Sequence, residues 1–162
     1  MSLDIHITQL ASPAGDLLRG LHIHVPAGKV HTLMGPSGCG KSSVLAAVCG
    51  TLDAGMVWDG RVTLNDQRIE SLPVQARRVG LLFQDDLLFA HMTVAENLLF
   101  AVPACGTNGI SLNNAQRQAR VQQALQEAEL SGMGERDPST LSGGQRARVA
   151  LMRALLAEPQ AL

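Results

Sequence analysis

A glycine-rich segment in the first third of the chain has residue types that suit phosphate binding. Residues 35–42 read Gly-Pro-Ser-Gly-Cys-Gly-Lys-Ser and fit the pattern G-x-x-x-x-G-K-[ST]. A phosphate chain is a dense anion, and glycines let backbone N–H groups converge on it without side chains in the way. A helix that starts near Lys41 would also point its positive end at the phosphates. The segment therefore predicts a phosphate-binding loop.

Two side chains of this loop have distinct predicted roles. The Lys41 ammonium would reach the β- and γ-phosphates, and the Ser42 hydroxyl would be a ligand to Mg²⁺. An ordinary glycine-rich turn with a solvated lysine is the alternative. It is disfavoured because an apolar stretch precedes the loop and a short apolar helix pattern follows it. The residues expected to contact the bound nucleotide are Gly35, Pro36, Ser37, Gly38, Cys39, Gly40, Lys41, Ser42 and Ser43.

A second glycine motif lies near the end of the chain, where Ser142-Gly143-Gly144-Gln145 follows Leu141. Serine is a good N-cap, and two glycines expose the first backbone N–H groups of the helix that follows. This arrangement predicts a second anion-binding helix end. A simple capped helix is the alternative, although a cap alone does not require Gly-Gly-Gln after the serine. Three arginines on this helix, Arg146, Arg148 and Arg153, are expected to solvate its outer face, and a role in catalysis is the disfavoured alternative.

Gln84 follows the continuous apolar run Val79–Phe83, which is typical of a strand buried on both faces. A polar residue at the end of a buried parallel strand lies where such sheets bind ligands. A polar strand terminus without a role is the alternative reading of Gln84. The apolar residues just after it, including Leu87 and Phe89, would belong either to the core or to a groove for a partner helix. His91 is interpreted as a surface histidine.

Taken together, the two glycine motifs resemble the nucleotide-binding subunit of an ATP-binding cassette (ABC) transporter, of the importer type. In that family the second motif, the signature, contacts the γ-phosphate of ATP held by the glycine loop of the other subunit. The resemblance therefore implies nucleotide contacts from Ser142, Gly143, Gly144 and Gln145. It also implies that Gln84 is a catalytic residue that touches Mg²⁺ and the attacking water. ATP and Mg²⁺ are the implied cofactors, with Ser42 and Gln84 on the metal.

The resemblance also implies partners and a location. It implies an ATP-sandwich dimer, expected to be a homodimer, docked on integral-membrane permease subunits that a solute-binding protein serves. The segment 87–97 resembles the surface that receives a helix from the membrane subunit. The chain would then lie in the cytoplasm, on the inner face of the cell membrane, and couple ATP hydrolysis to solute transport. No nucleic-acid partner is expected, because a net charge of −1 provides no basic stripe.

The sequence departs from the family pattern in two places. The family continues beyond Leu162 into a strand that ends in Asp and Glu, so these 162 residues are expected to bind ATP but hydrolyse it negligibly, unlike the full-length protein. The family also stacks an aromatic ring on adenine, whereas no aromatic precedes Trp58 here, so Leu10 or Pro13 would supply an apolar contact. Two alternatives remain: a non-transport ABC ATPase of the DNA-repair or translation type, and a non-enzymatic nucleotide-binding module.

The implied fold class is α/β: a P-loop NTPase (RecA-like) core with an N-terminal antiparallel β subdomain and a helical subdomain. The sheet is expected to be incomplete because the C-terminal part is missing. A length of 162 residues suits one domain. The resemblance places the core with its β subdomain at 1–88 and 141–162, and the helical subdomain at 89–140.

Hydrophobic periodicity and turn residues predict the elements that position these motifs. Residues 4–10, 21–25, 29–34 and 79–83 are predicted strands, and 56–64 a hairpin around Asp59-Gly60. Helices are predicted at 42–49, with Gly50 as its cap, at 94–102, from Ser111 or Asn113 to about Leu130, and at 145–156. Residues 105–109 are a predicted loop. The three cysteines lack metal-ligand spacing and are expected to be reduced thiols.

Overall fold

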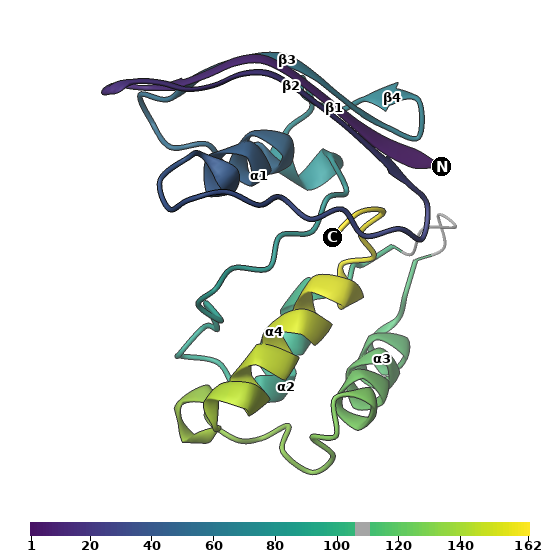
Figure 1. Cartoon of the computed structure of the whole chain (residues 1–162). Coiled ribbons are helices and arrows are strands. Elements are labelled where there is room, and N and C mark those ends of the chain that lie inside the picture. The colour runs from purple at the N-terminus through teal and green to yellow at the C-terminus, as the bar shows by residue number, and fades with distance from the viewer. Residues whose placement is uncertain (106–110) are drawn as a thin grey trace. The chain divides into compact units, whose positions relative to one another are not determined.

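The computed structural model describes residues 1–105 and 111–162 (Figure 1). Internal contacts group them into two compact units, residues 1–79 with Ala161 and residues 80–160 with Leu162. Each unit has its own hydrophobic core. The combination of an antiparallel sheet with helices confirms the predicted α/β class. The division at residues 88 and 141 stays a prediction, and the predicted loop at 105–109 lies outside the described residues except for Cys105.

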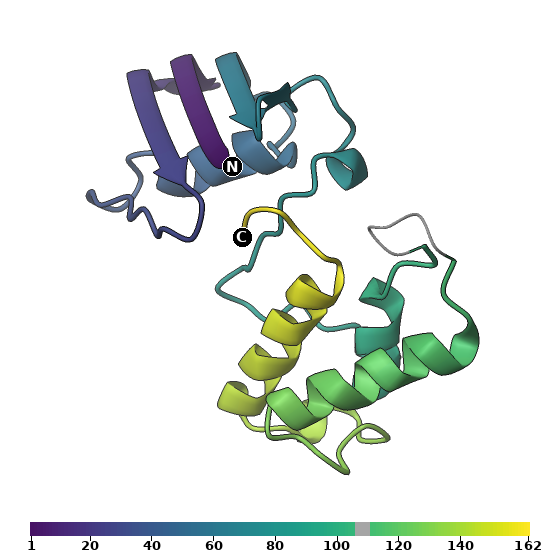
Figure 2. The ribbon, with the colours of Figure 1, turned by 90° about the vertical axis from the view of Figure 1, so that its right-hand side faces the viewer.

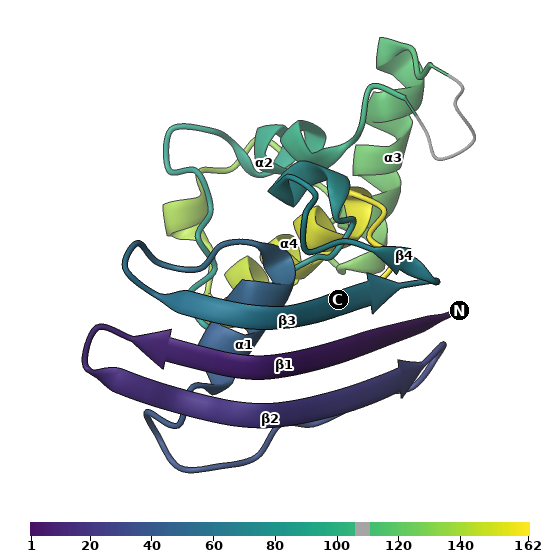
Figure 3. The same ribbon diagram turned by 90° about the horizontal axis from the view of Figure 1, so that it is seen from above.

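The first unit is built on a four-stranded antiparallel sheet of order β2-β1-β3-β4 (Figure 3). Its strands are β1 (Ser2–Ser12), β2 (Gly15–Pro26), β3 (Val57–Leu64) and β4 (Gln67–Arg68). Buried and exposed residues alternate in the first half of β1, where Ile5 and Ile7 are buried and His6 is exposed. A register shift between Ile7 and Gln9 then changes the phase, so that Leu10 is buried next. The strands predicted at 4–10 and 21–25 are confirmed.

The hairpin predicted around Asp59-Gly60 is wrong, because β3 runs through both residues without a turn. Gly60 is needed for close approach rather than for turning, since a Cβ there would lie 2.2 Å from the His6 carbonyl oxygen on β1. The turn lies instead at Asn65-Asp66, between β3 and β4, where φ is 51° and 66°. Asn and Asp are the non-glycine residues that adopt this left-handed conformation most readily.

One face of the sheet is covered by α1 (Lys41–Cys49), as Figures 1 and 3 show. Val44 and Val48 of this helix join Ile5, Ile23 and Val62 in the core of the unit. Gly50 ends the helix in the left-handed conformation, with φ 82°, and its N–H donates to the Ala46 carbonyl. The predicted helix and its glycine cap are thus confirmed. A short 3₁₀ helix, η1 (Val74–Ala76), precedes the end of this unit.

The strands predicted at 29–34 and 79–83 are not formed. Val30 and Met34 are 94% and 89% exposed, and Leu82 and Phe83 are exposed as well. A strand needs a neighbouring strand to take up its backbone N–H and C=O groups. Among the described residues, the segment 29–34 has no such ladder, and Val79 makes a single parallel bridge to Ala161. Hydrophobicity alone therefore misassigned both segments.

Within the described residues, the second unit has three α-helices around one apolar core (Figure 2). They are α2 (Val94–Ala101), α3 (Asn114–Glu127) and α4 (Gly143–Leu156), and a 3₁₀ helix, η2 (Pro138–Thr140), precedes α4. Each α-helix of this unit begins with a capping box, formed by Thr93, Asn113 and Ser142 in turn. Of the two predicted caps for α3, the structure selects Asn113. These caps fix where each helix starts, and so where the residues before it point.

Candidate functional site

The glycine loop at residues 35–42 uses its glycines for positive φ angles and for close packing. Gly38 and Gly40 have φ values of 82° and 89°, which a residue with a side chain adopts only with strain. Gly35 also excludes a side chain, because a Cβ there would lie 2.8 Å from the Cys39 sulfur. The Cys39 N–H donates to the Pro36 carbonyl at 3.4 Å and closes the loop. Gly38 and Gly40 are therefore required by their backbone conformation, and Gly35 by the close approach of Cys39.

Lys41 lies across this loop and holds its ammonium among backbone acceptors. Nζ donates to the carbonyl oxygens of Gly35 at 2.8 Å and Pro36 at 2.7 Å, and lies 3.7 Å from the Cys39 sulfur. Phosphate oxygens are stronger acceptors for a cation than neutral carbonyls. Phosphate oxygens would therefore compete well with these carbonyls for the Lys41 ammonium.

The N-terminus of α1 is open to an anion. In α1, which lies wholly within the described residues, no side chain caps the first turn and no acidic residue occupies it. The first N–H groups of a helix have no acceptor within the helix, and its dipole is positive at this end. The loop and helix end therefore fit a phosphate chain, and Ser37, Ser42 and Ser43 stand at or beside it.

A magnesium ion suits the Ser42 hydroxyl, which belongs to an exposed residue in the first turn of α1. Mg²⁺ is typically held by one or two protein ligands together with substrate phosphates and water. In residues 1–105 and 111–162, no three His, Cys, Asp or Glu side chains gather to hold a metal. The single Ser42 hydroxyl fits the small number of protein ligands that such an ion takes. Gln84 belongs to the other unit, so its share in this magnesium site stays a prediction.

The second glycine motif forms the N-terminus of α4. Ser142 Oγ accepts from the Gln145 N–H at 3.2 Å, and the Ser142 N–H donates to Gln145 Oε1 at 2.8 Å. The capping bond uses Ser142 only as an acceptor, so its hydroxyl proton remains a donor for an anion. Gly143 and Gly144 are exposed, and a Cβ at Gly144 would meet open space. The Gln145 amide serves the cap and lies 3.7 Å from the Met133 sulfur, so its direct contact with phosphate stays a prediction.

Gln84 and the start of α4 border the same hollow in the second unit. This hollow has a volume of about 390 Å³ and is lined by residues 82–86 together with Gly143 and Arg146. Gln84 itself is exposed. The structure thus brings the predicted Gln84 and the predicted signature helix end together. A larger hollow of about 570 Å³, on the outer face of the sheet around His6, His22 and Arg61, contains none of the predicted site residues.

The arginines of α4, predicted to solvate its outer face, are only partly exposed and also bind acceptors within the second unit. Arg146 Nε donates to Asp86 Oδ2 at 2.7 Å, and Arg153 donates to the Leu87 carbonyl at 3.0 Å. Arg148 donates to the Ala128 carbonyl at 2.8 Å. Burial lowers the pKa of Arg153, and the Asp86 carboxylate partly offsets this. The seven-residue spacing of Arg146 and Arg153, which places them on one helix face, was the signal available in the sequence.

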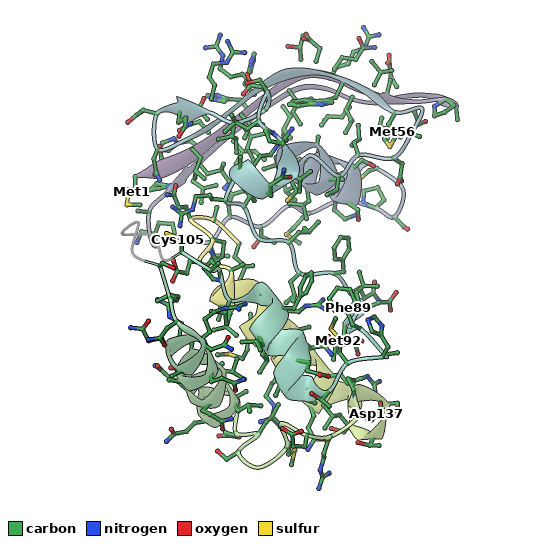
Figure 4. The ribbon with its side chains drawn as sticks, turned by 180° about the vertical axis from the view of Figure 1, so that it is seen from behind. Met1, Met56, Phe89, Met92, Cys105 and Asp137 are labelled. Carbon is green, nitrogen blue, oxygen red and sulfur yellow. The ribbon has the colours of Figure 1, made fainter. Side chains whose placement is uncertain are left out.

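The segment after Gln84 divides its apolar residues between core and surface. Leu88 packs against the helical core, whereas Leu87 is 54% exposed. Phe89 and Met92 lie beside α2, as Figure 4 shows, and the Phe89 ring meets Phe100 edge-on at a centroid distance of 5.0 Å. His91 is exposed, as predicted. The Phe89 ring therefore packs against Phe100, and both Phe100 and the nearby Leu87 are exposed.

Two further predictions concern the first unit and the cysteines. Leu10 is fully buried in the sheet core, so its predicted contact with adenine is wrong, while Pro13 is exposed and keeps that prediction. The three thiols are free, with Cys49 buried and Cys105 exposed. Burial raises the pKa of Cys49, against the opposing effect of the Arg77 cation. Among the described residues, no helix combines the length and the apolarity that crossing a bilayer requires.

Comparison with known proteins agrees with this geometry. Residues 18–162 match the ABC transporter family. The chain is 47% identical to the ABC transporter ATP-binding protein YnjD of Escherichia coli, over 94% of this chain and 68% of that protein. It is 36% and 38% identical to the sulfate/thiosulfate import ATP-binding proteins CysA of Synechocystis sp. and Gloeobacter violaceus, over 99% of this chain in each case. It spans 43% and 45% of those two relatives. The chain therefore belongs to the ABC transporter family, as an ATP-binding subunit.

Proposed function

We propose that the chain binds Mg²⁺-ATP in the glycine loop at residues 35–42. The observation that carries this proposal is the state of Lys41, whose ammonium is held only 2.7–2.8 Å from two loop carbonyls beside an open helix end. Ser42 would hold the Mg²⁺ that bridges the phosphates. Gly35, Gly38 and Gly40 would admit the phosphate oxygens, and the neighbouring backbone and side chains would line the site. Pro13 would supply the apolar contact to adenine.

A second copy of the chain would complete each site. The Ser142 hydroxyl and the N–H groups of Gly143 and Gly144 would bind the γ-phosphate of the nucleotide held by the partner, with Gln145 keeping that helix end in shape. Each ATP would then lie between two subunits, so nucleotide occupancy and dimer closure would be coupled by mass action. A homodimer suits this arrangement because one chain carries both halves.

The energy of this cycle would drive import of a solute. The relatives named as sulfate/thiosulfate import proteins support the direction of transport. Permease subunits would dock at residues 87–97, which include the exposed Leu87 and a Phe89 ring that packs on Phe100, and a solute-binding protein would deliver the cargo. The chain would thereby lie in the cytoplasm, at the inner face of the membrane.

Phosphoryl transfer depends on positioning and on neutralising charge. Gln84 would orient the attacking water and touch the metal, and Lys41 would neutralise charge on the transferred group. The 162 residues contain no carboxylate in a motif that would polarise this water. We therefore expect a polypeptide of these residues to bind ATP with very slow turnover.

Titration of the chain with a fluorescent ATP analogue, with and without Mg²⁺, tests this proposal. We expect Lys41→Ala to weaken binding at least tenfold, because the mobile cation over the loop is lost. Lys29→Ala is the matched control, since Lys29 is exposed outside the glycine loop, and it should bind like the parent chain. Equal affinity of the Lys41→Ala and Lys29→Ala variants would contradict the proposed site. Phosphate release measured on the same samples tests the slow turnover.

A further inference from the structure

Two arginines of α4 hold the backbone just after Gln84. Arg146 and Arg153 are seven residues apart, which places both on the same face of the helix. Arg146 Nε donates to the Asp86 carboxylate at 2.7 Å, and Arg153 donates to the carbonyls of Leu87 at 3.0 Å and Asp86 at 3.3 Å. The Arg153 guanidinium also lies 5.3 Å from the centre of the Phe89 ring. Side chain and backbone of this segment are thus bound to one helix.

The far end of the same segment is held by α2. Asn97 is fully buried, and its Oδ1 accepts from the Phe89 N–H at 2.8 Å. Its amide nitrogen donates to the carbonyls of Phe89, Met92 and Thr93 at 2.9–3.2 Å. Residues 86–89 are therefore attached to α4 at one end and to α2 at the other.

These polar links act where packing is weak. Hollows of about 390 and 220 Å³ border residues 80–86 along α4, and Leu82, Phe83 and Gln84 are exposed. Leu87 has φ 45°, a left-handed conformation that a leucine adopts only when its surroundings impose it. Hydrogen bonds to the two arginines and to Asn97 therefore hold this segment, together with the packing of Leu88 against the helical core.

Arg146 joins this segment directly to the start of the signature helix. Besides Asp86, its guanidinium donates to the Leu141 carbonyl at 2.8 Å, and Leu141 immediately precedes the cap residue Ser142. One planar side chain thus bridges the residue two places after Gln84 and the residue one place before Ser142. Because the guanidinium is rigid and planar, its contacts with Asp86 and Leu141 are fixed in geometry relative to each other.

We propose that Arg146 is a positioning residue that transmits the position of the Gln84–Leu87 segment to the Ser142–Gly144 helix end, with Arg153 fixing the backbone on which it acts. The consequence for ATP rests on the proposed function, in which Gln84 attends the nucleotide of its own subunit and Ser142 that of the partner. Through Arg146, a shift of Gln84 at the subunit's own nucleotide would alter the Ser142–Gly144 helix end that contacts the nucleotide of the partner.

Hydrogen exchange of the intact chain tests the link itself, without nucleotide. Asp86→Asn removes the carboxylate charge at constant size, and we expect exchange in residues 141–147 to quicken at least fivefold. Asp86→Glu keeps the charge and should retain slow exchange. Arg148→Gln is the matched control, since Arg148 lies on the same helix but binds Ala128 and Glu129, and it should leave residues 141–147 unchanged. Faster exchange confined to residues 84–89 in Asp86→Asn would overturn the proposal.

A cycle of variants separates this link from a general loss of stability. If Asp86 acts through Arg146, Asp86→Asn combined with Arg146→Gln should exchange in residues 141–147 no faster than Arg146→Gln alone. If the increases in exchange rate of the two single variants multiply in the double variant, the link is refuted. An equal increase in the exchange rate of α3 would likewise show a general weakening of the unit and refute the link. This readout decides the proposal even where a variant is less stable.

Sedimentation with Mg²⁺-ATP tests the functional consequence. We expect Asp86→Asn to weaken ATP-dependent self-association about tenfold while the affinity of the glycine loop for the fluorescent ATP analogue stays as in the parent chain. Equal loss of both affinities would contradict a positioning role. A parent chain that binds no nucleotide would instead contradict the proposed function, and the exchange experiment would still decide the link.

Discussion

The guanidinium of Arg77 donates a 2.9 Å hydrogen bond to the carbonyl oxygen of Val48, in the last turn of the helix that begins at Lys41. Arg77 is only 8% exposed. Its other acceptors are the carbonyl oxygens of Ala47, Glu70 and Leu72, at 2.8–3.0 Å. A buried cation therefore meets the negative end of the α1 dipole and satisfies carbonyls that the helix leaves free. The helix that carries the glycine loop is held at its far end by this contact.

Replacing Arg77 should destabilise the first unit. Arg77→Met keeps much of the apolar stem but leaves several buried carbonyls without a donor, which should lower the free energy of unfolding by about 3 kcal/mol. Urea unfolding followed by circular dichroism measures this. Arg61→Met is the matched control, because Arg61 is exposed on β3 and its loss should change stability by less than about 0.5 kcal/mol. Similar unfolding midpoints for the two variants would argue against the capping role of Arg77.

Gly60 should tolerate no side chain, although β3 is otherwise regular at this point. In Gly60→Ala the new Cβ would lie 2.2 Å from the His6 carbonyl oxygen and 2.9 Å from the Ile7 Cα, both backbone atoms that cannot swing aside. We expect a loss of stability of about 3 kcal/mol from the forced separation of β1 and β3. Thermal unfolding of Gly60→Ala beside Asp59→Ala, an exposed neighbour on the same strand, measures the effect. Unchanged melting of Gly60→Ala would mean that β1 and β3 do not approach this closely.

Two substitutions of Ser142 separate its structural from its proposed functional role. Ser142→Ala removes the cap of α4 and should cost about 1 kcal/mol of stability. Ser142→Asp is a good cap and should keep that stability, but its carboxylate would repel a γ-phosphate. Both variants should lose ATP-dependent association, although only the alanine variant should melt earlier. An aspartate variant that still associates with ATP would contradict phosphate binding at this helix end.

The buried thiol of Cys49 should make stability depend on pH in the alkaline range. Its pKa is raised by burial, so the folded state favours the neutral thiol. Its contribution is therefore fully present below the pKa of an unfolded thiol, about 8.5, and is lost as the pH rises through the higher folded value. Between pH 7 and pH 9.5, the urea midpoint of unfolding should fall further for the parent chain than for Cys49→Ala, which has no thiol to ionise at this position. Equal falls would exclude the effect.

The order of thiol modification provides a second check on this burial. The exposed Cys105 should react first with a thiol reagent at pH 8, and the buried Cys49 last, because the thiolate is the nucleophile and burial disfavours it. Mass spectrometry of partly alkylated chain identifies the order. Early modification of Cys49 in the native chain would indicate that its site opens easily.

Local features of the molecule followed from neighbouring residues in the sequence. Thr93, Asn113 and Ser142 each have a glutamate or glutamine three residues later, and each forms the reciprocal cap that this spacing favours. The glycine cap at Gly50 formed for a similar reason, since only a few residues separate its donor from its acceptors. Such features depend on contacts within one turn of chain.

Features that depend on a distant partner were missed. The apolar segments 29–34 and 79–83 have the composition of buried strands, yet a strand forms only where another strand offers its backbone groups. Asp59-Gly60 has the composition of a turn, yet the glycine serves the close approach of β1. The seven-residue spacing of Arg146 and Arg153 places both on one helix face, but it does not identify residues 86 and 87, some sixty positions earlier, as their acceptors.

The amino-acid sequence by itself determined the glycine loop with its positive φ angles and the capped start of α4, because both depend on glycine and serine at fixed short spacings. Only the tertiary structure decided that Arg77 holds the end of the loop helix and that Arg146 joins Asp86 to Leu141. The physical reason is reach: a loop or cap is closed by its own neighbours, whereas a buried cation or a bridging guanidinium takes acceptors that only folding brings within 3 Å.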